Sequence, residues 1–129
     1  MDKKLPNITD AEWSVMEIIW SKKGATARQV LEELEGVLEW SPTTVYTLIS
    51  RLEKKNVIKS VDGSAPKNYY PLIAKSQYKK EETNSFLNRL YNGSMRLFLT
   101  SFVKEGGLSP DELKELRDIL DENIKNGGE

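Results

Sequence analysis

The sequence predicts a mainly α-helical chain with one small β-hairpin. Apolar residues recur at i, i+3, i+4 and i+7, the spacing of one helix face, over most of its length. Several of these segments begin with Ser or Thr followed three residues later by Glu or Gln, a helix-start signal. Between residues 57 and 72 the spacing becomes that of strands around a turn. The expected order is three helices, a hairpin and three further helices.

Composition limits the class of protein. The 129 residues allow one ordinary domain or two small lobes, and 30% charged with 38% hydrophobic residues is typical of a soluble, helix-rich protein. The chain has no cysteine and no histidine, which excludes thiol and histidine catalysis, disulfides and Cys/His zinc sites. It has neither a signal peptide's apolar core nor a run near the ~20 apolar residues of a membrane span. We therefore expect a cytoplasmic protein that is no enzyme and holds no metal or cofactor.

Two capping boxes predict the first two helices. In Thr9–Glu12 and Thr26–Gln29, the first and last side chains can each satisfy a free backbone N–H of the other. The residues expected on the buried face of the first helix are Trp13, Met16, Ile19 and Trp20. Those of the second are Val30, Leu31 and Leu34.

The stretch Ser41–Lys55 carries the strongest functional signal. Ser41 is a candidate N-cap and Pro42 suits the first helical position. The expected inward stripe is Val45, Leu48, Ile49 and Leu52. The expected outer face is Thr43, Thr44, Tyr46, Thr47, Ser50, Arg51 and Lys54. Thr and Ser are mediocre helix formers, and hydrogen-bonding side chains that end in positive charge suit the DNA major groove. The alternative is an ordinary solvated face.

A β-hairpin is expected directly after this helix. Residues 57–61 and 67–72 are β-prone, and residues 62–66 between them are typical of a turn. A polar third helix followed by a hairpin predicts a winged helix-turn-helix DNA-binding domain over residues 1–73, although the hairpin could merely cover the core. The candidate DNA-binding residues are Thr43, Thr44, Tyr46, Thr47, Ser50, Arg51, Lys54, Lys55, Lys59 and Lys67.

Residues 74–129 predict a C-terminal three-helix dimerisation domain. The three helices are expected over residues 76–91, from about residue 95 to residue 105, and after Ser109-Pro110. A unit of about 55 residues rarely buries enough apolar area alone, so it should pair with a second copy. The alternative is packing against the N-terminal lobe. The candidate dimerisation residues are Phe86, Leu90, Met95, Phe98, Leu99, Phe102, Leu113, Leu116 and Leu120.

Charge gives the DNA-binding hypothesis only local support. The formal net charge is −1, whereas nucleic-acid-binding domains are often strongly basic. Basic residues nevertheless outnumber acidic ones between Arg51 and Lys75. The near-neutral total keeps open an alternative function, a winged-helix protein-interaction module that does not bind DNA.

Four stretches resemble the penicillinase-repressor family of bacterial transcription factors, of the BlaI/MecI type. They are ITDAEWSVMEIIW, WSPTTVYTLISRLEKKNVI, NYYPLI and FVKEGGLSPDELKELRDIL, which together span nearly the whole chain. The resemblance implies a homodimeric repressor of β-lactam-resistance genes, held on palindromic operator DNA. It also implies that the helix 41–55 enters the major groove. By position, base and phosphate contacts would fall to Thr43, Thr44, Tyr46, Thr47 and Arg51.

The resemblance also implies a switch. In this family a membrane sensor-protease detects β-lactam, and the repressor is then cleaved in its dimerisation lobe at an Asn-Phe bond. The matching position here is Ser101-Phe102, which keeps only the second residue. Cleavage in the middle of the apolar stripe 95–103 would split a helix that the dimer needs. A sister branch senses copper through cysteines, which this chain lacks.

Overall fold

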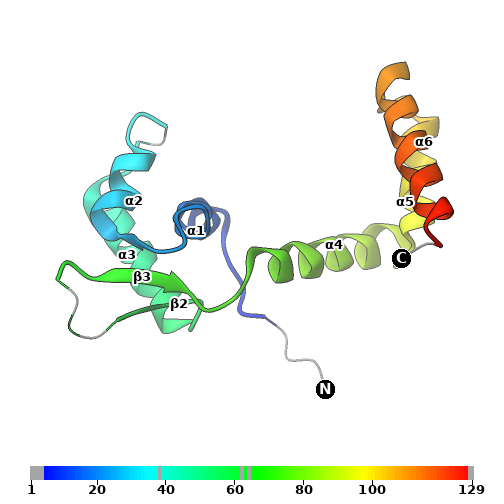
Figure 1. Ribbon diagram of the computed structural model, residues 1–129. Coiled ribbons are helices and arrows are strands. Elements are labelled where there is room, and N and C mark those ends of the chain that lie inside the picture. Colours follow the sequence, from blue (N-terminus) through cyan, green and yellow to red (C-terminus); the bar gives the residue numbers. More distant parts are fainter. Residues whose placement is uncertain (1–4, 38, 62, 64, 128–129) are drawn as a thin grey trace. The chain divides into compact units, whose positions relative to one another are not determined.

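The computed structural model describes residues 5–37, 39–61, 63 and 65–127, and confirms the mainly α-helical fold class with a small hairpin. The elements (Figure 1) are α1 (Asp10–Lys22), β1 (Ala25–Thr26), α2 (Ala27–Leu34), α3 (Pro42–Lys54), β2 (Ile58–Ser60), β3 (Asn68–Pro71), α4 (Lys75–Tyr91), α5 (Met95–Lys104) and α6 (Pro110–Lys125). The expected turn residues Asp62 and Ser64 lie outside the described residues.

The chain forms two compact units that divide between Glu81 and Glu82. The first unit holds α1–α3, the three strands and the first turns of α4, and the second holds the rest of α4 with α5 and α6. The sequence-based boundary after residue 73 lies just before α4 begins.

Capping side chains set the helix boundaries. Thr9 Oγ1 accepts the Glu12 N–H at 3.1 Å while Glu12 Oε1 accepts the Thr9 N–H at 2.9 Å. Thr26 with Gln29, and Ser109 with Glu112, form the same reciprocal box at the starts of α2 and α6. These contacts satisfy N–H groups that have no partner within the helix, so the expected helix starts are confirmed.

The hairpin belongs to a three-stranded antiparallel sheet with the order β1-β3-β2. Ser60 and Ala25 both face Tyr69 of β3, one from each side. The strand β1 was not predicted, because Thr26 was read only as a helix cap. A strand of two residues is too short to show an alternating pattern in the sequence, and only its pairing with β3 makes it a strand. Pro71 ends β3, a position that tolerates a residue without an N–H.

Gly24 makes the close turn from α1 into β1 possible. Its φ of +126° is one that L side chains rarely adopt, and a Cβ there would lie 2.5 Å from the Tyr70 ring. The Tyr70 ring therefore lies directly over a glycine, and this contact joins β3 to the end of α1.

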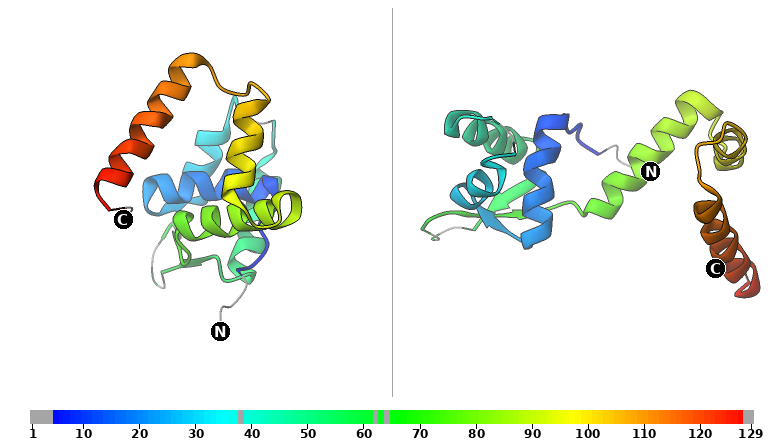
Figure 2. Two further views of the ribbon diagram at one scale, coloured as in Figure 1. Left: turned by 90° about the vertical axis from the view of Figure 1, so that its right-hand side faces the viewer. Right: turned by 90° about the horizontal axis from the view of Figure 1, so that it is seen from above.

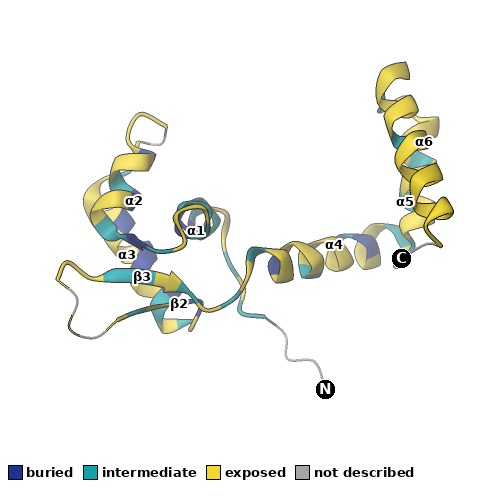
Figure 3. Ribbon diagram, viewed as in Figure 1, coloured by how far each residue is buried: buried dark blue, intermediate teal, exposed yellow. Residues whose placement is uncertain are grey.

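The core of the first unit forms where α1, α2 and α3 face one another and the sheet (Figure 3). Its buried side chains are Val15, Met16, Ile19, Ala25, Val30, Leu34, Val45, Leu48, Ile49, Leu52, Val57, Ile58 and Tyr78. All four residues of the predicted inward stripe of α3 are among them. Trp13 and Trp20, expected on the buried face of α1, are half-buried. Both rings contact Tyr78 near the start of α4.

The second unit buries very little by itself. Leu87 is the only buried side chain among residues 82–127, and α5 and α6 are largely exposed (Figure 3). An aromatic cluster, Phe86, Tyr91, Phe98 and Phe102, joins α4 to α5 with ring centroids 5.3–5.8 Å apart. Figure 2 shows α5 and α6 as consecutive helices joined by a turn. None of the helices within the described ranges is long and apolar enough to cross a membrane.

Candidate nucleic-acid interface

The outer face of α3 forms an open groove. The groove is lined by Thr43, Tyr46, Thr47, Ser50, Arg51 and Lys54. All six were predicted as DNA-binding residues, and all six are exposed. They face outward because Val45, Leu48, Ile49 and Leu52 fix the opposite side of the helix in the core, at 0–4% exposure.

The threonines of α3 use their hydroxyl groups locally. Thr47 Oγ1 donates to the backbone oxygen of Thr43 at 2.9 Å. Thr44 Oγ1 lies 3.1 Å from the Oγ of the N-cap Ser41, so Thr44 belongs to the helix cap. Since the Thr47 hydroxyl already has a partner, the methyl group is the part of this side chain that has no hydrogen-bonding role within the helix.

Four basic side chains are available to a DNA backbone. Arg51, Lys54, Lys59 and Lys67 are exposed, and none of them makes an ion pair within the described part of the chain. Arg51 and Lys54 extend from the last turn of α3, while Lys59 lies in β2 and Lys67 directly precedes β3. Ser60 Oγ donates to Glu53 Oε2 at 3.2 Å and so ties β2 to α3. The β2–β3 hairpin, which we call the wing, and α3 are thus connected, and both present positive charge.

Lys55 differs from the other predicted DNA contacts. Its Nζ donates to Glu12 Oε1 at 2.7 Å and to the backbone oxygen of Asn7 at 3.0 Å, and its side chain is 33% exposed. Lys55 lies three residues after Leu52 and seven after Leu48, which places it on the inward side of α3. That spacing could have shown from the sequence that Lys55 is off the outer face.

Glu12 is a structural residue that the sequence interpretation read only as a cap. Its side chain is 1% exposed, and its spacing to Val15, Met16 and Ile19 is that of the buried face of α1. Burial raises the pKa of its carboxyl, but hydrogen bonds from Lys55 and Thr9 outweigh burial and leave the pKa below the usual 4.5. The second carboxylate oxygen, Oε2, has no hydrogen-bond partner within the described residues. Glu12 is therefore a buried, charged partner for Lys55.

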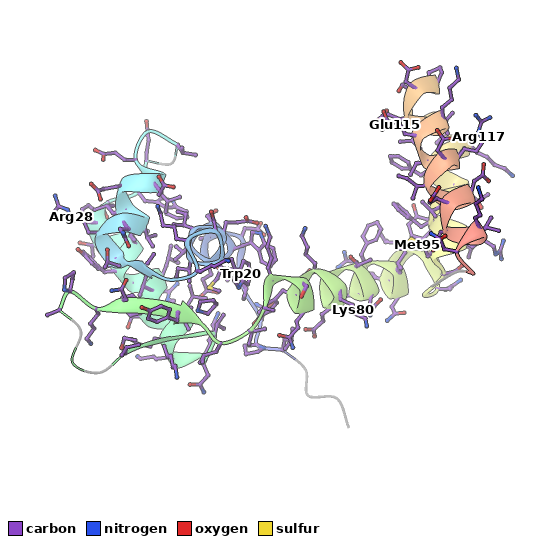
Figure 4. The ribbon with its side chains drawn as sticks, viewed as in Figure 1. Trp20, Arg28, Lys80, Met95, Glu115 and Arg117 are labelled. Atoms are coloured by element: carbon purple, nitrogen blue, oxygen red, sulfur yellow. The ribbon has the colours of Figure 1, made fainter. Side chains whose placement is uncertain are left out.

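The start of α4 is fixed to α1 by polar and aromatic contacts. Trp20 Nε1 donates to the backbone oxygen of Ile73 at 2.9 Å, and Figure 4 shows Trp20 on the side of α1 where α4 begins. Lys75 Nζ lies 2.9 Å from Glu17 Oε2. The buried Tyr78 ring lies 6.2 and 6.1 Å from the rings of Trp13 and Trp20. Burial, with the nearby Glu81 and Glu12 carboxylates, raises the pKa of the Tyr78 hydroxyl to about 12.

The predicted dimerisation residues are exposed or half-buried in the single chain. Leu90 and Leu120 are 58% and 55% exposed, and Met95, Leu99, Phe102 and Leu113 are 38–44% exposed. Phe86, Phe98 and Leu116 are half-buried. The candidate cleavage bond Ser101-Phe102 lies within α5, and the Phe102 ring lies against Gly107, where a Cβ would approach it to 2.8 Å.

The structure has three packed helices, the third of which exposes a polar face, and a β-hairpin. These features define a winged helix-turn-helix protein. The family model for the penicillinase repressor matches residues 8–122, and the chain belongs to this family. The chain is 42% identical over 120 residues to the methicillin resistance regulatory protein MecI of Staphylococcus aureus (strain N315), covering 93% of this chain and 98% of MecI. It is 37% identical over 121 residues to the penicillinase repressor of Bacillus licheniformis, covering 94% of each chain.

Two solved structures of the repressor BlaI are similar to this chain. The solution structure of monomeric Bacillus licheniformis BlaI in complex with the blaP half-operator has a TM-score of 0.53 and 36% identity. The solution structure of the DNA-binding domain of BlaI has a TM-score of 0.50 and the same identity. Each match covers 60% of this chain and 94% of the solved one.

Proposed function

We propose that this chain is a homodimeric transcriptional repressor that binds palindromic operator DNA through α3 and the wing. The observation that carries the proposal is the α3 groove, in which six exposed polar or basic side chains stand opposite a fully buried stripe. Support comes from the BlaI half-operator complex, whose protein is 36% identical to this chain. Penicillin- or methicillin-resistance genes, named in the descriptions of the relatives, are the proposed targets.

Arg51, Tyr46 and Ser50 are proposed to read base edges, while Lys54, Lys59 and Lys67 hold the phosphate backbone. Thr43 and Thr47 would line the base-facing groove, and Thr44 would support the helix start beside it. Because the formal net charge of the chain is −1, non-specific attraction to DNA is weak, and the local basic side chains must supply the electrostatic part of binding.

The second unit is proposed to dimerise through the partly exposed apolar side chains of α4, α5 and α6. The near absence of buried side chains among residues 82–127 supports this, because such a unit gains too little burial to be stable alone. A two-fold dimer would cover the same apolar surface on both copies. It would also place two copies of α3 for two half-sites.

Proteolysis at Ser101-Phe102 is the proposed release mechanism, with a membrane sensor-protease as the partner. The bond lies within α5, beside the aromatic cluster, so cleavage would separate Phe102 from Phe98. Mass spectrometry of the repressor from β-lactam-treated cells should find a fragment that ends at Ser101. Full-length repressor in cells whose target genes are induced would contradict this mechanism.

Binding to DNA from the upstream region of this chain's own gene tests the main proposal. Fluorescence anisotropy with a labelled duplex should show binding that weakens steeply as salt rises, because bound Lys and Arg release counterions. Absence of binding at low salt would overturn the proposal and favour a winged-helix module that binds proteins.

A further inference from the structure

Two neighbouring carbonyl groups of the N-terminal segment contact two different helices. The backbone oxygen of Asn7 accepts the Lys55 ammonium at the end of α3 at 3.0 Å. The backbone oxygen of Pro6 accepts the Tyr78 hydroxyl of α4 at 2.9 Å. We call residues 5–9 the N-terminal strap. The strap thus joins α3 to α4 through adjacent peptide groups, and its last residue, Thr9, caps α1.

Both ends of this connection are anchored. At the α3 end, Lys55 also pairs with Glu12, whose side chain is 1% exposed. At the α4 end, Tyr78 is 2% exposed and packs against Trp13 and Trp20. Buried partners in fixed positions transmit a displacement, whereas exposed, mobile side chains absorb it.

Lys55 is badly placed to serve DNA as well. A phosphate contact would need the ammonium to leave Glu12, and a buried carboxylate would then lose its cationic partner. Lys54, one residue earlier, lies in the α3 groove and has no such partner among the described residues. Two consecutive lysines therefore have different environments and are suited to different tasks.

We propose that Lys55, Glu12 and Tyr78 are positioning residues for operator binding, linked by the N-terminal strap. This inference rests on the proposed function. The link holds the end of α3 in a fixed position relative to the first turns of α4, the helix that continues into the second unit. Disturbing α4 at Tyr78 then lowers operator affinity, although Tyr78 lies outside the α3 groove.

Three substitutions in the full chain test the inference. Lys55→Met removes the charge and keeps the length, Tyr78→Phe removes one hydroxyl and keeps the ring, and Lys54→Met is the matched control. Operator affinity is measured by anisotropy on the upstream duplex over a range of salt concentrations, with circular dichroism to establish that each variant is folded.

The salt dependence separates the roles. Lys54→Met should lower the slope of log K against log salt by about one per bound copy, and so by about two for a dimer, because each copy loses a phosphate contact. Lys55→Met and Tyr78→Phe should keep the wild-type slope while affinity falls roughly 3- to 10-fold. The double variant should lose less than the product of the two single losses, since both substitutions break one link. A slope lowered in Lys55→Met as far as in Lys54→Met, wild-type affinity in Tyr78→Phe, or multiplicative losses in the double variant would each overturn the inference.

Hydrogen exchange provides a readout that needs no DNA. In Tyr78→Phe, amides in the last turn of α3, residues 51–54, should exchange several-fold faster than in the wild type, whereas the buried turn around Met16 should not change. Unchanged exchange at the end of α3 would refute the link even if the chain did not bind DNA. If the wild type does not bind DNA but exchange at the end of α3 is faster in Tyr78→Phe, the proposed function is wrong and the link between α3 and α4 is supported. If Lys55→Met does not fold, the operator affinity, salt slope and hydrogen exchange of Tyr78→Phe test the inference on their own.

Discussion

Arg51 is the only arginine on the outer face of α3, and its planar guanidinium can pair with both acceptors of a guanine edge. Arg51→Ala should weaken operator binding by roughly 1–3 kcal/mol and relax the preference at one base pair. Anisotropy with base-substituted duplexes measures both effects. The control is Lys125→Ala, which removes an exposed basic side chain from the last turn of α6, away from the face that carries Leu113 and Leu120. Equal, small effects of the two substitutions would exclude base reading by Arg51.

Thr47 should act through its methyl group, because its hydroxyl bonds to the backbone of Thr43. Thr47→Ser keeps that hydrogen bond and removes only the methyl. Replacing the contacted thymine by uracil should cost the wild type roughly 0.8 kcal/mol, the contribution of one buried methyl, and cost Thr47→Ser nothing further. Binding measured with both proteins on both duplexes gives this coupling directly. A uracil penalty of the same size in both proteins would show that the contact lies elsewhere.

The Glu12–Lys55 pair should make stability depend on pH. The folded-state pKa of Glu12 lies below 4.5, so its contribution is present above about pH 4.5 and is lost as pH falls through the folded-state value. Glu12→Gln should therefore destabilise the chain by roughly 2 kcal/mol at pH 7, with the difference shrinking below pH 4.5. Thermal unfolding of both proteins between pH 7 and 3 measures this. A constant difference across that range would mean that the charge of Glu12 has no role.

At the scale of elements, the turn after α1 depends on one glycine. Gly24→Ala introduces both an unfavourable φ and a Cβ 2.5 Å from the Tyr70 ring, whereas Gly36→Ala introduces only an unfavourable φ with open space around it. Gly36→Ala should cost about 1 kcal/mol of unfolding free energy and Gly24→Ala about 2–4 kcal/mol. Urea unfolding of the two variants makes the comparison. Equal costs would show that the Tyr70 ring moves away easily.

Elements with strong local signals could be predicted from the sequence. The helix α3 is predicted by Ser41, Pro42 and a four-residue apolar stripe, and in the structure it extends from Pro42 to Lys54. The strand β1 could not be predicted, because its two residues become a strand only by pairing with β3. Seven of the ten candidate DNA contacts lie on the expected outer face of α3, and six of these seven line its groove. Lys55 was included on charge alone, although its helical spacing places it inward.

At the scale of the whole molecule, the proposed function requires dimerisation through the second unit. Leu120→Asp introduces a charge on α6 at a side chain that is 55% exposed in one chain. Because the proposed dimer would bury this position, the variant should be monomeric and bind the full operator at least tenfold more weakly. Light scattering after size exclusion gives the mass. Glu115→Lys, which reverses an exposed charge on the opposite side of α6, serves as the control, and a dimeric Leu120→Asp would exclude this surface.

The central claim is that two copies of α3 hold one palindromic operator. Hydroxyl-radical footprinting of the full chain on the upstream region of its gene tests this claim most directly. We expect two protected half-sites related by symmetry, with centres about one helical turn or a multiple of it apart, and protection by Arg51→Ala only at higher protein concentration. A single protected segment, or no protection at concentrations where the chain is dimeric, would contradict the claim.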